Sequence, residues 1–214
     1  MPLELYGRPL GPVQANCYVL VDREGGQALV IDPGAPDPWL WEQVEGLRVQ
    51  AIVLTHAHFD HIGAVAELHR RTAAPILIHE AEAGWLTDPV LNGSARWEDQ
   101  IGRVTAPPAH GRLEPGRPLA FAGREIEVRH TPGHSPGSVS LILDDLCFAG
   151  DTLFYRSIGR TDLPGGDHPT LLSSIRTQLL SLDDEVTVLP GHGPSTTIGD
   201  ERRFNPFLKG WVDA

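Results

Sequence analysis

Residues 55–61 read Thr55-His56-Ala57-His58-Phe59-Asp60-His61 and lie between a predicted strand and a predicted helix. A single histidine usually stays on the surface or fills a core, and an aspartate such as Asp60 could simply cap the helix. Three imidazoles and one carboxylate within six residues are different, because burying them together costs free energy and adds nothing to apolar packing. This heptapeptide therefore predicts a metal site.

The spacing within the heptapeptide indicates which way its side chains point. Residues 51–55 form a short apolar run typical of a buried strand, and 62–71 carry apolar residues at helical spacing. His56 and His58 are two apart, so they point the same way in an extended segment. Asp60 and His61 fall where the chain turns into the helix and can point elsewhere. One short segment can therefore serve two neighbouring metals.

Three further ligand-type residues lie at the ends of predicted strands. His134 lies in a Pro- and Gly-rich turn, Asp151 ends an apolar strand, and His192 follows another strand beside two glycines. Each alone is readily interpreted as a turn or cap residue. Together with the heptapeptide, however, all lie at C-terminal strand edges and can converge. Imidazole and carboxylate suit zinc, iron or manganese, and seven such ligands favour two ions with Asp151 bridging them.

Short apolar segments bounded by Gly and Pro recur along the chain and indicate layered α and β structure. The predicted strands are 15–21, 27–31, 51–55, 74–79, 124–130, 138–143, 146–149 and 186–189. The predicted helices are 37–45, 62–71 and 170–180. Residues 84–117 are rich in Pro and Gly and match neither pattern.

The composition predicts one globular domain. The chain has 214 residues, 41% of them apolar, which is enough for a full hydrophobic core. The net charge of -11 argues against nucleic acid and anionic membranes as partners. Cys17 and Cys147 lie in apolar stretches and are predicted to be buried free thiols. The N-terminus shows no signal-peptide pattern and no apolar run approaches about 18 residues, so we expect no membrane span and a cytoplasmic location.

These elements, in this order, resemble the metallo-β-lactamase superfamily, whose H-x-H-x-D-H metal motif the heptapeptide matches in full. Within that superfamily the chain is similar to the glyoxalase-II-like branch, over about residues 13–208. The segments that carry this closer resemblance are 131–138 (TPGHSPGS), 150–154 (GDTLF), 157–162 (SIGRTD), 190–194 (PGHGP) and 197–207.

The resemblance implies an α/β fold, a four-layer αβ/βα sandwich with two mixed β-sheets and the metals at their shared edge. It implies one domain over residues 1–214, without the C-terminal helical region with which full-length glyoxalase II grips glutathione. It assigns the metal ligands as two sets and a bridge: His56, His58 and His134; Asp60, His61 and His192; and Asp151 between them. Arg160 stands where the longer enzymes carry a basic glutathione contact, so it either binds a substrate carboxylate or is solvated or structurally paired.

The expected function is hydrolysis of a small-molecule thioester or ester, of the S-acyl-glutathione type, by a hydroxide bridging two divalent metals. Zn is the expected metal, with Fe or Mn as alternatives. Asp60 and Asp151 are the candidate catalytic residues, and Asp60 is expected to orient the hydroxide. The main alternative is a persulfide dioxygenase of this superfamily, which uses a single iron and carries a segment like 159–162. A nuclease is disfavoured by the acidic charge, and a non-enzymatic metal protein by the number of ligands.

Two other polar residues carry weaker signals. Asp32 precedes a Pro-Gly pair and is interpreted as a turn residue, with the orientation of a metal ligand as the alternative. His130 is interpreted as a structural residue or as the partner of a ligand.

Overall fold

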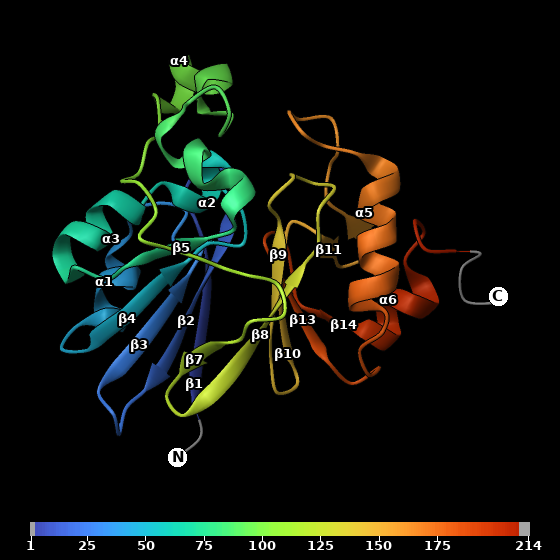
Figure 1. Cartoon of the computed structure of the whole chain (residues 1–214), viewed down its shortest axis with the longest axis horizontal. Coiled ribbons are helices and arrows are strands. Elements are labelled where there is room, and N and C mark those ends of the chain that lie inside the picture. The colour runs from blue at the N-terminus through green and yellow to red at the C-terminus, as the bar shows by residue number, and fades with distance from the viewer. Residues whose placement is uncertain (1–2, 210–214) are drawn as a thin grey trace.

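The computed structural model describes residues 3–209 and shows two six-stranded sheets packed face to face, with helices outside them (Figure 1). The first sheet has the order β1 (Glu4–Leu10), β2 (Ala15–Asp22), β3 (Gln27–Ile31), β4 (Arg48–Val53), β5 (Ile76–Ile78) and β6 (Gly111–Arg112). The second has the order β14 (Thr196–Thr197), β13 (Thr187–Pro190), β10 (Leu146–Gly150), β9 (Val139–Leu143), β8 (Arg124–His130) and β7 (Leu119–Phe121). A small ribbon pairs β11 (Leu153–Phe154) with β12 (Ser157–Ile158).

Both sheets are mixed. In the first, β1, β2 and β3 are antiparallel neighbours, whereas β3, β4, β5 and β6 are parallel. Parallel neighbours need a crossover, and the helices α1 (Pro38–Val44) and α3 (Val65–Thr72) lie in the first two of these connections. In the second sheet, β10 and β13 are parallel, and the connection between them contains α5 (His168–Ser174) and its π-helical continuation η3 (Ile175–Leu179). The helix α6 (Ile198–Phe204) follows β14.

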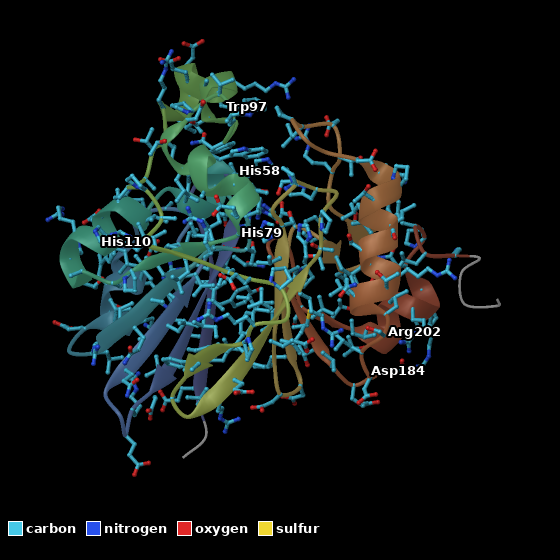
Figure 2. The ribbon with its side chains drawn as sticks, in the orientation of Figure 1. His58, His79, Trp97, His110, Asp184 and Arg202 are labelled. Carbon is cyan, nitrogen blue, oxygen red and sulfur yellow. The ribbon has the colours of Figure 1, made fainter. Side chains whose placement is uncertain are left out.

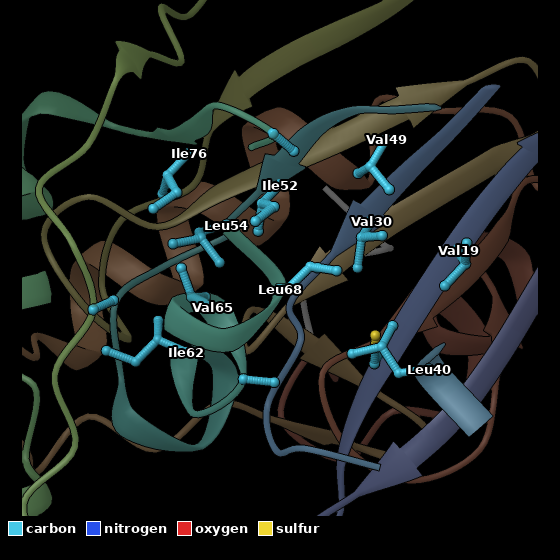
Figure 3. Packing of buried hydrophobic residues seen from close by; sticks show 14 of the residues in the cluster. Val19, Val30, Leu40, Val49, Ile52, Leu54, Ile62, Val65, Leu68 and Ile76 are labelled. Atoms are coloured by element: carbon cyan, nitrogen blue, oxygen red, sulfur yellow. The ribbon is translucent and has the colours of Figure 1, made fainter. Parts of the chain in front are cut away.

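The alternation of side chains along the strands explains the layers, because successive residues of a strand point to opposite faces. On β2, Val19 packs in the cluster that faces α1 and α3, and Leu20 packs in the cluster between the sheets. Figure 3 shows the first cluster, where Leu68 of α3 lies near Val30 and Ile52. Both faces of the first sheet are therefore buried.

The second sheet is covered in the same way. Phe148 of β10 points into the cluster between the sheets, whereas Cys147 points outward against α5 and α6, in a cluster with Leu171 and Ile198. The order from one side to the other is helices, sheet, sheet, helices. The predicted four-layer sandwich with two mixed sheets is therefore confirmed. None of the described helices is long and apolar enough to cross a membrane.

The predicted strands 15–21, 27–31, 124–130, 138–143 and 146–149 agree with the structure to within a residue at either end. Both cysteines are buried and free, as predicted. The strand predicted at 51–55 begins and ends earlier, as β4, and the strand predicted at 74–79 is shorter, as β5. The helix predicted at 170–180 begins at His168, where Asp167 caps it by accepting from the backbone N–H of Thr170.

The helix predicted over 62–71 is confirmed from Val65 onward, as α3, but its predicted start is wrong. The structure has α2 (Phe59–Ile62) and then α3, with a break at Gly63 and Ala64. The break occurs where Gly63 approaches Gly34, since a Cβ on Gly63 would overlap the carbonyl oxygen of Gly34. Residues 84–117, which match no pattern in the sequence, include the second half of the 3₁₀ helix η1 (Glu80–Thr87), then η2 (Ser94–Trp97), α4 (Glu98–Ile101) and β6.

Candidate metal centre

The ligand-type residues lie where the strands end. The heptapeptide connects β4 to α2, and His134 lies in the turn between β8 and β9. Asp151 follows β10 directly, and His192 lies two residues after β13. Figure 2 shows His58 at the edge of the sandwich where the two sheets meet. The convergence expected from strand ends is therefore present in the folded chain.

Three histidines form the first cluster. One ring nitrogen each from His56, His58 and His134 lies within 4.8 Å of the others, and all three side chains are buried. Nδ1 of His58 lies 2.8 Å from Nε2 of His134, and the two rings are perpendicular. Two nitrogens at this distance can share one proton, and they are also close enough to be ligands of the same cation.

A second cluster contains Asp60, His61 and His192. Oδ2 of Asp60 lies 3.2 Å from Nε2 of His192 and 3.8 Å from Nε2 of His61. The N-cap of α2 is His58, and the Asp60 side chain points into the cluster. The alternative interpretation of Asp60 as a helix cap is therefore wrong.

Asp151 lies between the two clusters. Its Oδ1 is 3.4 Å from Nε2 of His61, and its Oδ2 is 3.5 Å from Nε2 of His134 and 3.6 Å from Nε2 of His192. Gly191 allows this position, because a Cβ there would overlap Oδ1 of Asp151. A single carboxylate thus faces ring nitrogens of both clusters.

Hydrogen bonds behind the rings set which nitrogen of each carries a lone pair. Nδ1 of His61 donates to Oδ2 of Asp32 at 3.0 Å. The hydroxyl of Thr55 donates to the same oxygen at 2.6 Å, so it accepts from Nδ1 of His56 at 3.0 Å. Nδ1 of His134 donates to the backbone carbonyl of Arg160 at 2.8 Å. Each of these bonds leaves Nε2 as the nitrogen that faces the centre.

Asp32 is therefore more than the turn residue that the sequence suggested. It accepts from the backbone N–H and hydroxyl of Thr55 and from the His61 ring, and it is buried. The residue also has a positive φ of 50°, so it does form the turn as well. His130 donates from Nε2 to the carbonyl of Pro136 and stacks on His79, which supports the structural interpretation.

The chemistry of the centre fits cations. Nε2 of His56, His58 and His61 and Oδ1 of Asp151 are buried without a hydrogen-bond partner, which is costly unless another group satisfies them. Burial lowers the pKa of His56, and burial and His134 lower that of His58 to about 3, so both rings are neutral and can ligate. Burial also lowers the pKa of His61, but the carboxylates of Asp151 and Asp60 outweigh it and raise the pKa well above its usual value. The two carboxylates thus favour a positive charge at this position, whether a proton on the His61 ring or a cation bound to it.

The centre opens into a cavity of about 1060 Å³. Its walls include the partly exposed side chains of Val13, Val90 and Trp97. Arg160 lies at its rim and pairs with Asp162 through two 2.7 Å hydrogen bonds, so that of the two interpretations of Arg160 the structure shows the paired one. This contact also lowers the pKa of Asp162 to about 2.

The sequence interpretation missed Thr55 and Glu82 as supporting residues. Thr55 directly precedes the first histidine, and this position is the only feature of the sequence that could have indicated its supporting role. Glu82 lies between the predicted strand 74–79 and the unassigned residues 84–117, and its carboxylate accepts from backbone N–H groups that are 25 and 55 residues away.

Comparison with known proteins gives a consistent result. The model of the metallo-β-lactamase superfamily matches residues 10–192. A probable metallo-hydrolase, YqgX of Bacillus subtilis, is 44% identical and aligns over 95% of this chain and 96% of its own. The hydroxyacylglutathione hydrolase GloC of Haemophilus influenzae is 37% identical, over 94% and 95%.

Solved structures agree in fold. The B3 metallo-β-lactamase BLEG-1 superimposes with a TM-score of 0.90 at 46% identity, covering 97% of this chain and 100% of its own. TTHA1623, in a di-iron-bound form, gives 0.83 at 40% identity, covering 95% and 100%. ETHE1 from Myxococcus xanthus gives 0.76 at 28% identity, covering 98% and 85%.

Proposed function

The chain belongs to the metallo-β-lactamase superfamily and is an enzyme of that superfamily, and on this premise we propose that it hydrolyses thioesters of the S-acyl-glutathione type. The observation that carries the proposal is the pair of ligand clusters on either side of Asp151, open to a large cavity. The relative named as a hydroxyacylglutathione hydrolase supports the class of substrate.

In this proposal His56, His58 and His134 hold one divalent ion, and Asp60, His61 and His192 hold the other. Asp151, whose carboxylate faces both clusters, would be the ligand that they share. Zn is the metal we propose, and the di-iron form of TTHA1623 makes Fe the alternative to test. Two divalent ions, when bound, would lower the pKa of a water molecule enough to make it a nucleophile near neutral pH.

The residues of the chain position the nucleophile and the substrate. Asp60 lines the cavity, and its carboxylate accepts a hydrogen bond from the nucleophile and orients it toward the carbonyl carbon. A thiolate is a good leaving group, so the site needs no strong general acid. Arg160 becomes able to bind a substrate carboxylate when the substrate displaces Asp162 from its exposed ion pair.

The persulfide dioxygenase remains the second candidate, because ETHE1 shares the fold at 28% identity. Such an enzyme uses one iron held by two histidines and one aspartate. Here the histidine and aspartate side chains form two adjacent clusters, an arrangement that favours two ions.

The two candidates differ in what they consume. We expect the metal-loaded protein to contain about two metals per chain and to hydrolyse S-acyl-glutathione without taking up oxygen. One iron per chain, with oxygen uptake on glutathione persulfide, would favour the dioxygenase. A β-lactam substrate belongs in the same assay because of the likeness to BLEG-1. No turnover of any thioester or ester by the metal-replete protein contradicts the proposal.

A further inference from the structure

Glu82 is a buried carboxylate that has no role in the function proposed above. It lies on η1 and is fully buried. Its Oε2 accepts from the backbone N–H of Ala57 at 2.6 Å, and its Oε1 accepts from the backbone N–H of Gly137 at 2.7 Å. Ala57 separates two histidines of the first cluster, and Gly137 follows the third by three residues. One side chain thus joins the two loops that carry this cluster.

The surrounding residues are shaped around this contact. A Cβ on Gly137 would lie 2.9 Å from Cγ of Glu82, so glycine there keeps the backbone close to the carboxylate. Trp85, on the same 3₁₀ helix, packs its ring 6.0 Å from that of His58. The helix therefore holds the His58 loop through both a hydrogen bond and a ring contact.

The charge of Glu82 complements the composition of the first cluster. Burial raises the pKa of Glu82, and hydrogen bonds from Ser135 and from two backbone amides lower it, with a smaller lowering by the charge of His61. The hydrogen-bond partners are all neutral donors, so a buried anion here gains most from a nearby cation. The second cluster has its own carboxylate in Asp60, whereas the first consists of three imidazoles.

We propose that Glu82 is a positioning residue for the first cluster, where it holds the loops of His58 and His134 together and places a negative charge behind three neutral rings. The inference rests on the proposed function only in requiring that the first cluster bind a divalent cation. It makes Glu82 the counterpart of Asp32, which accepts from the His61 ring directly and supports the His56 ring through the Thr55 hydroxyl.

The test is Zn²⁺ affinity, measured by chelator competition, in two backgrounds that each keep one cluster intact. His192→Ala leaves the first cluster, and His134→Ala leaves the second. Adding Glu82→Gln to the first background should weaken Zn²⁺ binding by at least about tenfold, the effect expected of a group that orients a ligand. In the second background we expect a change of less than about threefold, because Glu82 contacts that cluster only at Ala57, in the loop of Asp60 and His61, and does not contact the loop of His192.

Glu80→Gln is the matched control, because Glu80 lies on the same 3₁₀ helix with an exposed side chain. It should change neither affinity. Equal weakening in both backgrounds, or none in the first, would overturn the proposal. If one of the two backgrounds binds no Zn²⁺, the Glu82→Gln variant of the otherwise unchanged chain is titrated with Zn²⁺ instead, and its two binding steps are compared with those of the unsubstituted chain. Loss of one binding step supports the proposal. Loss of both steps, or of neither, overturns it. An unsubstituted chain that binds Zn²⁺ without cleaving thioesters contradicts only the proposed function, and one that binds none contradicts both.

Discussion

Replacing Asp32 by Asn should weaken metal binding although Asp32 is not one of the proposed ligands. Oδ1 of Asp32 accepts from the backbone N–H of Thr55, and Oδ2 accepts from both the Thr55 hydroxyl and Nδ1 of His61. An Asn amide can keep the first bond, but its NH₂ group cannot accept the other two. The positive φ of residue 32 is no obstacle, since Asn tolerates that conformation as well as Asp.

The expected size of the loss in metal affinity follows from the tautomer of His61. An NH₂ group at Oδ2 favours a lone pair on Nδ1 of His61, which moves the ring proton to Nε2, the nitrogen that faces Asp60 and Asp151. A protonated nitrogen cannot ligate. Loss of such a supporting hydrogen bond costs about 10- to 100-fold in metal affinity, which corresponds to about 1.4 to 2.7 kcal/mol.

The assay is Zn²⁺ competition against a chromophoric chelator, followed by thioester hydrolysis at saturating metal. Asp22→Asn is the control, because Asp22 also accepts a backbone hydrogen bond but lies at the end of β2, next to the turn to β3. We expect Asp32→Asn alone to lose affinity. Affinities within about twofold of the unsubstituted chain would refute the tautomer argument.

Three further perturbations test the centre and the core. Gly191→Ala should destabilise the protein by about 1–3 kcal/mol and reduce activity, since its Cβ would overlap Asp151; an unchanged melting temperature and kcat contradict this. Removing metal with a chelator should abolish hydrolysis and lower the melting temperature, because a ligand at 100 times its Kd stabilises by about 2.7 kcal/mol; activity that survives exhaustive chelation counts against a metal mechanism. Leu68→Ala, at a fully buried site on α3, should lower the free energy of unfolding by denaturant by about 2–5 kcal/mol, while kcat of the folded enzyme stays the same. A decrease below about 1 kcal/mol would show that α3 packs loosely.

The fold could be predicted where local patterns and tertiary structure agree. The strand before His56 and the turn around His134 have strong local signals, so the ligand positions could be placed at strand ends. The helix boundary at Gly63 could not be predicted, because it depends on contact with Gly34, which is distant in sequence. β1 was missed because, as an edge strand, much of it is exposed and lacks a clear apolar alternation.

The candidate site likewise has parts that the sequence predicts and parts that it does not. The shared position of the imidazoles and carboxylates at C-terminal strand ends was enough to predict which side chains would converge, although each of the three later ones alone is equally typical of a turn or cap. The supporting hydrogen bonds were not predictable, because Glu82 reaches backbone groups 25 and 55 residues away. The sequence left two interpretations of Arg160 open, substrate binding or a structural ion pair. Side-chain rotamers, which the sequence does not specify, place its guanidinium against Asp162.

The division of ligands between the sheets has a mechanical consequence. Each cluster takes two side chains from the loop that follows β4 and a third from the half of the chain that contains β8 to β13. An ion bound in either cluster would therefore crosslink the two halves of the sandwich. If the chain were cut between β6 and β7, each fragment would carry only part of the ligand set of each cluster. Ion binding would then require the two fragments to associate, and the bound ion would in turn stabilise their association.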